Sequence, residues 1–214
     1  MEVNDMRIAP FGPEHLDEAV SLLITTFQER PFYQYIAPDP NERRDFLALN
    51  FHQRLEHSLG VSEIELAFHG LRIVGIAVWA RPAGAAPLDA SPPEETFPGF
   101  SAGLRERMSG FLHILIAARD QAVRQPYWSL APIAVLPEEQ GKGIASSLIR
   151  KKLRDIDVSP APCFLGTQDA VNLDIYARYG FQKVREDPLT PGLVHYTMVR
   201  PKQASHFTGT PVER

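Results

Sequence analysis

Cysteine is almost absent from the 214-residue sequence, in which Cys163 is the only one. An internal disulfide is therefore excluded, and no cysteine cluster indicates a zinc site. The seven histidines are scattered, and none of them forms the His-Glu-x-x-His pair of a zinc protease. We therefore expect no metal.

The sequence also lacks an excess of basic residues and any long apolar run. Its formal net charge is -4, so no broad basic surface argues for nucleic acid as a partner. No segment approaches the roughly 18 apolar residues that indicate a membrane span. The stretch MEVNDMRIAPF carries acids and has no apolar core of a signal peptide. We expect a cytoplasmic protein without a membrane partner, either a monomer or a homodimer.

Helical and strand periodicities are what the sequence does contain. Helices are predicted for residues 13–27, 41–60 (with Asn41 as the cap), 104–123, 144–153 and 172–179. Strands are predicted at 7–10, 64–68, 71–80, 127–135, 163–167, 181–185 and 193–199. Residues 30–40 and 82–98 are predicted to be connecting segments. We expect one α/β or α+β domain over residues 1–200, followed by a polar tail at 201–214.

The segment EEQGKGIASSLIR, residues 138–150, places two glycines between a predicted strand and a predicted helix. It is not a P-loop, because Lys142 is followed by Gly143 and the residue five before Gly141 is Leu136. It is not a dinucleotide fingerprint either, because Ser146 occupies the position of the third glycine.

The segment instead fits the pattern Gln-x-x-Gly-x-Gly/Ala, with Gln140, Gly143 and Ala145 in register. The first amides of a helix have no partners within the helix and carry partial positive charge. Small residues allow a phosphate group to approach these amides closely. The segment therefore predicts a pyrophosphate site.

A second motif, NLDIYARYGF, spans residues 172–181. Together the two motifs resemble the GNAT superfamily of acetyl-coenzyme A-dependent N-acetyltransferases, closely over residues 127–185 and loosely over the whole chain. Within that superfamily the stretches PYWSLAPIAVLPEEQGKGIASSL and IAVWARP resemble enzymes of the puromycin N-acetyltransferase type. The resemblance implies a mixed, mostly antiparallel sheet of about seven strands flanked by helices. It also implies that the fourth and fifth strands splay apart, and that acetyl-CoA is the acyl donor.

The resemblance further implies a donor site and a catalytic tyrosine. The expected coenzyme-binding residues are Ile133, Ala134, Val135, Gln140, Gly141, Lys142, Gly143, Ile144, Ala145, Ser146 and Asn172. Tyr176 is expected to donate a proton to the departing thiolate, because a phenol is neutral at rest. The fourth predicted strand has no carboxylate to act as general base. A water relay, His195 or Glu65 would have to accept the proton.

The acceptor is expected to be a small primary amine such as an antibiotic, a xenobiotic or an amine metabolite. The candidate substrate residues are Tyr33, Tyr35, Trp79, Trp128 and His195. Glu29, Asp39 and Glu65 are candidates to attract an ammonium group. Two alternatives stay open, namely an enzyme of the same fold that modifies peptide amines and a degenerate acyl-CoA sensor. An open acidic groove favours the peptide, whereas a closed aromatic pocket favours the small amine.

Overall fold

The computed structural model describes residues 6–82, 97–124, 126–158 and 161–202. Most of the connecting segment predicted at 82–98 and of the tail predicted at 201–214 lies outside these residues.

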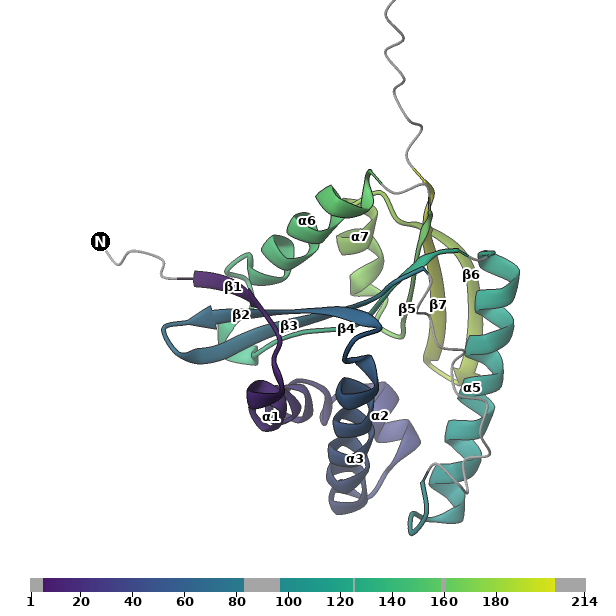
Figure 1. Cartoon of the computed structure of the whole chain (residues 1–214). Helices are drawn as coiled ribbons and strands as arrows, with labels where there is room; N and C mark the ends of the chain where they lie inside the picture. Colours follow the sequence, from purple (N-terminus) through teal and green to yellow (C-terminus); the bar gives the residue numbers. More distant parts are fainter. Residues whose placement is uncertain (1–5, 83–96, 125, 159–160, 203–214) are drawn as a thin grey trace, which may run out of the picture.

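A seven-stranded sheet runs through the described chain in the order β1-β2-β3-β4-β5-β7-β6 (Figure 1). The strands are β1 (Met6–Pro10), β2 (Ser62–His69), β3 (Arg72–Ala80), β4 (Trp128–Val135), β5 (Cys163–Thr167), β6 (Gln182–Thr190) and β7 (Leu193–Arg200). Every neighbouring pair is antiparallel except β4 and β5, which are parallel. The mixed, mostly antiparallel sheet confirms the predicted architecture.

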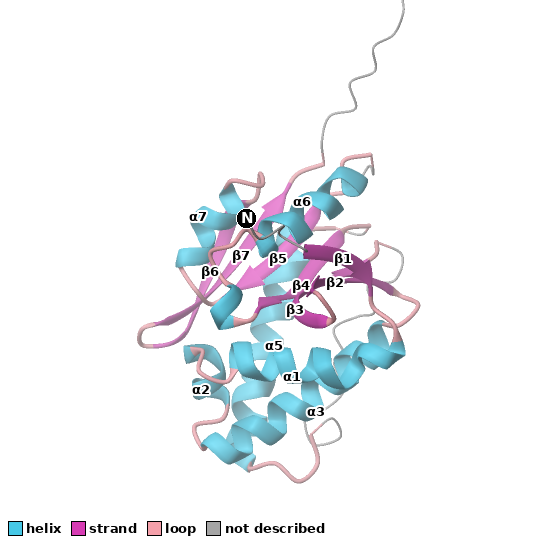
Figure 2. Ribbon diagram, turned by 90° about the vertical axis from the view of Figure 1, so that its left-hand side faces the viewer, coloured by secondary structure: helices cyan, strands magenta, loops and turns pink. Residues whose placement is uncertain are grey.

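Helices cover both faces of this sheet (Figures 1 and 2). They are α1 (Leu16–Phe27), α2 (Pro31–Ile36), α3 (Pro40–Ser58), α5 (Ala102–Ala122), α6 (Ile144–Ile156) and α7 (Val171–Ala177), with short 3₁₀ turns η1 (Pro13–His15) and η2 (Pro137–Glu139). Helices α1, α2 and α3 lie on one side and α6 and α7 on the other, while α5 packs on β6, β7 and α2. No helix of the described ranges is long and apolar enough to cross a membrane.

The region between α1 and α3 differs from the sequence prediction. A connecting segment was expected there, but Pro31–Ile36 forms a helix that buries Phe32 and Ile36. Proline suits the first position of a helix, and the two apolar residues four apart share one face. The cap of α3 is Asp39 rather than Asn41, because its carboxylate accepts the amides of Asn41 and Glu42 at 3.0 and 2.8 Å.

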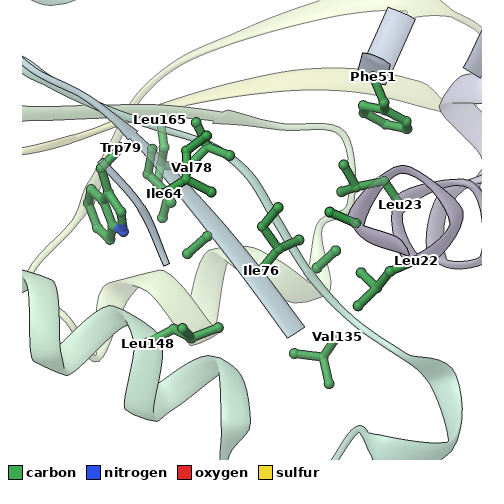
Figure 3. Close-up of a cluster of buried hydrophobic side chains, with 14 of the residues drawn as sticks. Leu22, Leu23, Phe51, Ile64, Ile76, Val78, Trp79, Val135, Leu148 and Leu165 are labelled. Atoms are coloured by element: carbon green, nitrogen blue, oxygen red, sulfur yellow. The ribbon is translucent and has the colours of Figure 1, made fainter. Parts of the chain in front are cut away.

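The hydrophobic core extends to both sides of the central strands (Figure 3). Leu22 and Leu23 of α1 lie on one side of these strands, and Leu148 of α6 lies on the other. Leu23 and Leu148 are completely buried, and burial of such a side chain contributes about 1.5–3 kcal/mol. Packing on both faces therefore fixes the strands between α1 and α6.

Candidate active site

Strands β4 and β5 separate after a short parallel contact. Their pairing extends from Trp128 to Leu130 on β4, opposite residues 163–165 of β5. On the other side, the register between β4 and β3 shifts between Ala77 and Trp79, so that β4 carries one extra residue there. Such a bulge bends a strand and interrupts its ladder. Pro132, which has no amide hydrogen to donate, lies within the bulge. The predicted splay is thus present.

The backbone of β4 beyond the bulge offers free groups to the splay. The amide of Leu136 donates to the carbonyl of Val74 on β3 at 3.0 Å. Because backbone groups alternate in direction along an antiparallel strand, Ala134 also faces β3, and Ile133 and Val135 face away from it. The Val135 carbonyl accepts the Gln140 side-chain amide at 2.9 Å. The backbone groups of Ile133 and the amide of Val135 are therefore left facing the splay, whereas Ala134 is paired to the sheet.

The loop before α6 presents a row of unpaired amides. Gly141 and Gly143 have φ values of 79° and 82°, which favour glycine. The first amide to find a backbone acceptor is that of Ser147, which donates to Gly143 at 3.0 Å. The amides of residues 141–146 have no backbone acceptor in the described chain. They lie at the positive end of a 13-residue helix, where an anion is stabilised.

The splay and the loop open into one cavity of about 1740 Å³. Of the predicted coenzyme-binding residues, ten line it: Ile133, Ala134, Val135, Gln140, Gly141, Gly143, Ile144, Ala145, Ser146 and Asn172. Lys142 does not line it, since its ammonium group forms an ion pair with Glu139 at 3.0 Å. The cavity continues between α1, α3 and α5 to the opposite face of the sheet.

Tyr176 lies in the wall of this cavity, at the last turns of α7. Its ring packs edge-on against Phe181 at 6.0 Å, and only 8% of the residue is exposed. The hydroxyl makes no hydrogen bond to any other described residue. Burial, followed by the nearby Asp169 and Tyr179, raises the pKa of Tyr176 to about 12. The phenol is therefore neutral and available as a donor.

Asn172 connects α7 to the end of β5. Its side-chain amide donates to the Thr167 hydroxyl at 3.0 Å. Asn172 does not cap the helix, because the Asp169 carboxylate accepts the amide of Val171 at 3.2 Å. The side chain is thus held at the cavity wall, close to the point where β5 leaves β4.

No protein-family model matches the chain, but solved structures do. Histone acetyltransferase HPA2 and related acetyltransferase from Corynebacterium glutamicum is 18% identical with a TM-score of 0.69, covering 94% of this chain and 99% of that chain. Agmatine N-acetyltransferase is 16% identical with a TM-score of 0.62, covering 91% and 98%. PaiA N-acetyltransferase from Thermoplasma acidophilum, in complex with coenzyme A, is 11% identical with a TM-score of 0.59, covering 92% and 98%.

The chain has the GNAT fold. At identities of 11–18% the likeness concerns the arrangement of the elements. The site within this GNAT fold is therefore described from its own residues.

His195 also lies in the cavity wall and is fully buried. Its Nδ1 lies 2.8 Å from the side-chain amide of Gln168, and its ring packs edge-on against Phe111 at 5.5 Å. A Cβ on Gly166 would lie 2.5 Å from the imidazole, so only glycine allows β5 to approach this ring. Burial lowers the pKa of His195 to about 4, with a smaller opposing effect of Asp187. The imidazole is therefore neutral and a weak base.

The predicted aromatic substrate residues separate into two groups. Tyr33 lines the cavity, but Tyr35, Trp79 and Trp128 do not. Trp79 is completely buried in the core (Figure 3). The Lys152 ammonium group lies 4.5 Å from the Trp128 ring centre, which places this ring beside α6. In this GNAT fold both tryptophans belong to the packing of the sheet.

The acids that were candidates to attract an ammonium group also lie elsewhere. Glu29, Asp39 and Glu65 do not line the cavity. Asp39 caps α3, and Glu65 forms an ion pair with Lys151 of α6. None of these carboxylates belongs to the described cavity wall of this GNAT fold.

Several cavity residues were missed by the sequence analysis. Arg54 of α3, Phe111 of α5 and Tyr179 all line the wall. The Tyr179 hydroxyl lies 2.6 Å from the Ser146 hydroxyl, which connects α7 to the first turn of α6. A signal existed for Arg54, because it lies three residues after Phe51 and seven after Leu47, on the buried face of α3.

Among the described residues, no group of three or more His, Cys, Asp or Glu side chains could hold a metal ion.

Proposed function

We propose that this chain is an acetyl-CoA-dependent N-acetyltransferase that acts on a primary amine of a small molecule. The observation that carries the proposal is the junction of the β4–β5 splay, the unpaired amides before α6 and the Tyr176 hydroxyl in one cavity. The GNAT fold, shared with PaiA N-acetyltransferase in complex with coenzyme A, supports it.

The residues of the donor side fit coenzyme A. The amides of residues 141–146 bind the pyrophosphate, because they are unpaired and lie at a helix amino terminus. The outward backbone groups of Ile133 and Val135 pair with the amides of the pantetheine arm, as an added strand would. Asn172 contacts the same arm from α7. When bound, acetyl-CoA supplies the thioester whose carbonyl carbon accepts the amine.

Tyr176 donates a hydrogen bond to the departing sulfur, which takes up its proton from water as the amine nitrogen gives one up to water. The bond between the amine nitrogen and the carbonyl carbon forms as the carbon–sulfur bond breaks, and one proton leaves the nitrogen. A phenol with a pKa of about 12 is a weaker acid than a thiol, whose pKa is about 8.5. We therefore assign to Tyr176 mainly a hydrogen bond that stabilises negative charge on the sulfur.

Water removes the proton from the amine in this proposal. Strand β4 carries no carboxylate, and Glu65 lies outside the cavity. With a pKa of about 4, His195 is too weak a base for an ammonium group. Most of the rate would then come from the positioning of the two reactants.

Transfer is direct in this proposal, without an acyl-cysteine. Cys163 is the only cysteine of the chain. It is buried, it does not line the cavity, and burial raises its pKa to about 12. A thiol in that state has almost no thiolate character and is a poor nucleophile.

The acceptor side supports a small molecule rather than a peptide. Its wall carries the aromatic rings of Phe27, Phe32, Tyr33 and Phe111. The two acidic residues that line the described cavity, Glu139 and Asp169, are already in ion pairs. The acidic groove that a cationic peptide would favour is therefore missing from the described wall. The sequence likeness to puromycin-type enzymes favours the same class of acceptor.

Thiol release tests the proposal. The protein is incubated with acetyl-CoA and a panel of puromycin, polyamines, arylamines, amino acids and amino-terminal peptides. We expect turnover of at least one small amine and little turnover of peptides. Tight coenzyme binding without turnover of any amine would favour an acyl-CoA sensor, and absence of coenzyme binding would refute the proposal altogether.

A further inference from the structure

Arg54 is a cation on the apolar face of a helix. Along α3 it shares this face with Leu47, Phe51 and Ser58, all of which are buried. Tyr33, whose hydroxyl interacts electrostatically with Arg54, forms a cluster with Phe27 and Phe51, with ring centroids 5.6 to 6.0 Å apart. All of these rings and Arg54 line the cavity. Burial lowers the pKa of Arg54 from its ordinary value, which expresses the cost of a charge removed from water.

The hydrogen bonds of Arg54 leave most of its donors free. A guanidinium group has five N–H donors, yet the one hydrogen bond of Arg54 to the described chain is from Nη2 to the Ala131 carbonyl at 3.4 Å. Arg43, on the same helix, instead donates to the Ala37 carbonyl at 2.9 Å. Arg30, the residue before α2, lies 3.5 Å from the Asp169 carboxylate. Arg54 has no such carboxylate partner among the described residues.

Among the described residues, Tyr33 adds a hydrogen-bond donor beside Arg54, and no unpaired acid lines the cavity there. The Tyr33 hydroxyl makes no hydrogen bond to another described residue, and burial raises the pKa of Tyr33 to about 12, so it remains a neutral donor. Of the acids that line the described cavity, Asp169 is paired with Arg30, and Glu139 is paired with Lys142 and His69. Among the described residues, the unpaired charge on the acceptor side is therefore positive.

We infer that the acceptor is an amine that also carries a carboxylate, and that Arg54 and Tyr33 bind this carboxylate. The inference rests on the proposed function and specifies its substrate class. One guanidinium group and one phenol match the single charge of a carboxylate, whereas a phosphate monoester carries about two charges at neutral pH.

The position of Arg54 limits the length of the acceptor. Its contact with Ala131 places the guanidinium group next to the bulge, where β4 leaves β5. The attacking nitrogen must reach the splay while the carboxylate lies on Arg54, so the two groups must be close in the molecule. An α-amino acid meets this condition. The rings of Phe27, Tyr33 and Phe51 suit an apolar or aromatic side chain.

Paired acceptors test the inference. L-phenylalanine is compared with 2-phenylethylamine, and L-leucine with 3-methylbutylamine, by thiol release with acetyl-CoA. The members of each pair differ in the carboxylate alone. We expect kcat/KM to favour the acids by about 10- to 100-fold, because a charge-assisted bidentate contact is worth that much.

Substitution of the arginine assigns this preference to its group. In Arg54→Met the ratio between acid and amine should approach one, and in Arg54→Lys it should be intermediate, because the charge remains but the planar fork is lost. Arg44→Met, on the exposed side of the same helix, should keep the wild-type ratio. Thermal unfolding of each variant confirms that it is folded. If Arg54→Met does not fold, Tyr33→Phe is tested in its place.

The outcomes separate the inference from the proposed function. If wild-type protein acetylates the decarboxylated amines as well as the acids, the inference is overturned and the function stands. If no amine is acetylated, calorimetric titration of L-phenylalanine into the protein alone decides. Binding that is lost in Arg54→Met upholds the carboxylate site, and absence of binding overturns it.

Discussion

Replacement of Tyr176 by phenylalanine tests the chemistry with little disturbance of the fold. The ring, which packs against Phe181, is retained, and the hydroxyl that is removed has no partner in the described chain that would be left unsatisfied. The loss is therefore confined to one donor at the cavity wall. A hydrogen bond to a charged group is worth about 1.5–3 kcal/mol. At about 1.4 kcal/mol for each factor of ten, kcat should fall about 10- to 100-fold.

Steady-state thiol release gives kcat, and calorimetry gives the dissociation constant for coenzyme A. We expect kcat of Tyr176→Phe to fall while coenzyme affinity changes by less than about threefold, since the hydroxyl acts on charge that develops during the reaction. Tyr179→Phe is the matched control. It removes the bond to Ser146 at the start of α6, so it should weaken coenzyme binding more than it lowers kcat.

The pH profile provides a second check on Tyr176. Because burial raises its pKa to about 12, the phenol stays protonated throughout the physiological range. Its ionisation should therefore cause no loss of rate below about pH 10. An unchanged kcat in Tyr176→Phe would refute the donor role. A loss of wild-type rate near pH 9 that is missing from the variant would refute the raised pKa.

Three further predictions concern the loop and the His195 wall. In Gly143→Val the new residue would have to adopt a φ of 82°, which is strained for a side chain branched at Cβ. Coenzyme affinity, measured by calorimetry, should therefore fall about tenfold. Lys142→Ala, the control, should change it less than about threefold. In Gly166→Ala the new Cβ meets His195 at 2.5 Å, which should cost about 1–3 kcal/mol and lower Tm by several degrees. The folded pKa of His195 is about 4, below the ordinary 6.5, so its contribution to stability is present above pH 6.5. As the pH falls to 4, about 3 kcal/mol should be lost in urea melts, and less in His195→Gln.

The proposed donor site leaves a pattern in the sequence because it is local. The groups that we propose bind the anion are backbone amides of six consecutive residues, and two glycines with positive φ set their direction. Such a site leaves a contiguous pattern of small residues between a strand and a helix. The loop around Gly141 and Gly143 therefore lines the cavity as expected. The pattern did not contain the alternation along β4, which directs the backbone amide and carbonyl of Ala134 toward β3.

The face to which an aromatic side chain points could not be predicted in the same way. Alternation along β3 puts Val78 and Trp79 on opposite faces, and the sequence does not say which face carries the cavity. The structure places Val78 in the cavity wall and Trp79 in the core. Aromatic character alone was therefore a poor guide to substrate contact, since large apolar side chains are needed on both faces of a sheet.

The proposed acceptor site is harder to predict because its residues come from elements distant in the chain. Tyr33, Arg54, Phe111 and His195 lie on α2, α3, α5 and β7 and meet only in the folded cavity. A helix's buried face is predicted from the spacing of its apolar residues. An arginine on that face is therefore assigned to the exposed side of the helix. Arg54 nevertheless lies between Phe51 and Ser58, two buried residues of the same face. The Arg54 side chain is partly buried there, and an opposite charge lowers the cost of burying a cation. Since no described residue supplies that charge, we propose that the acceptor does.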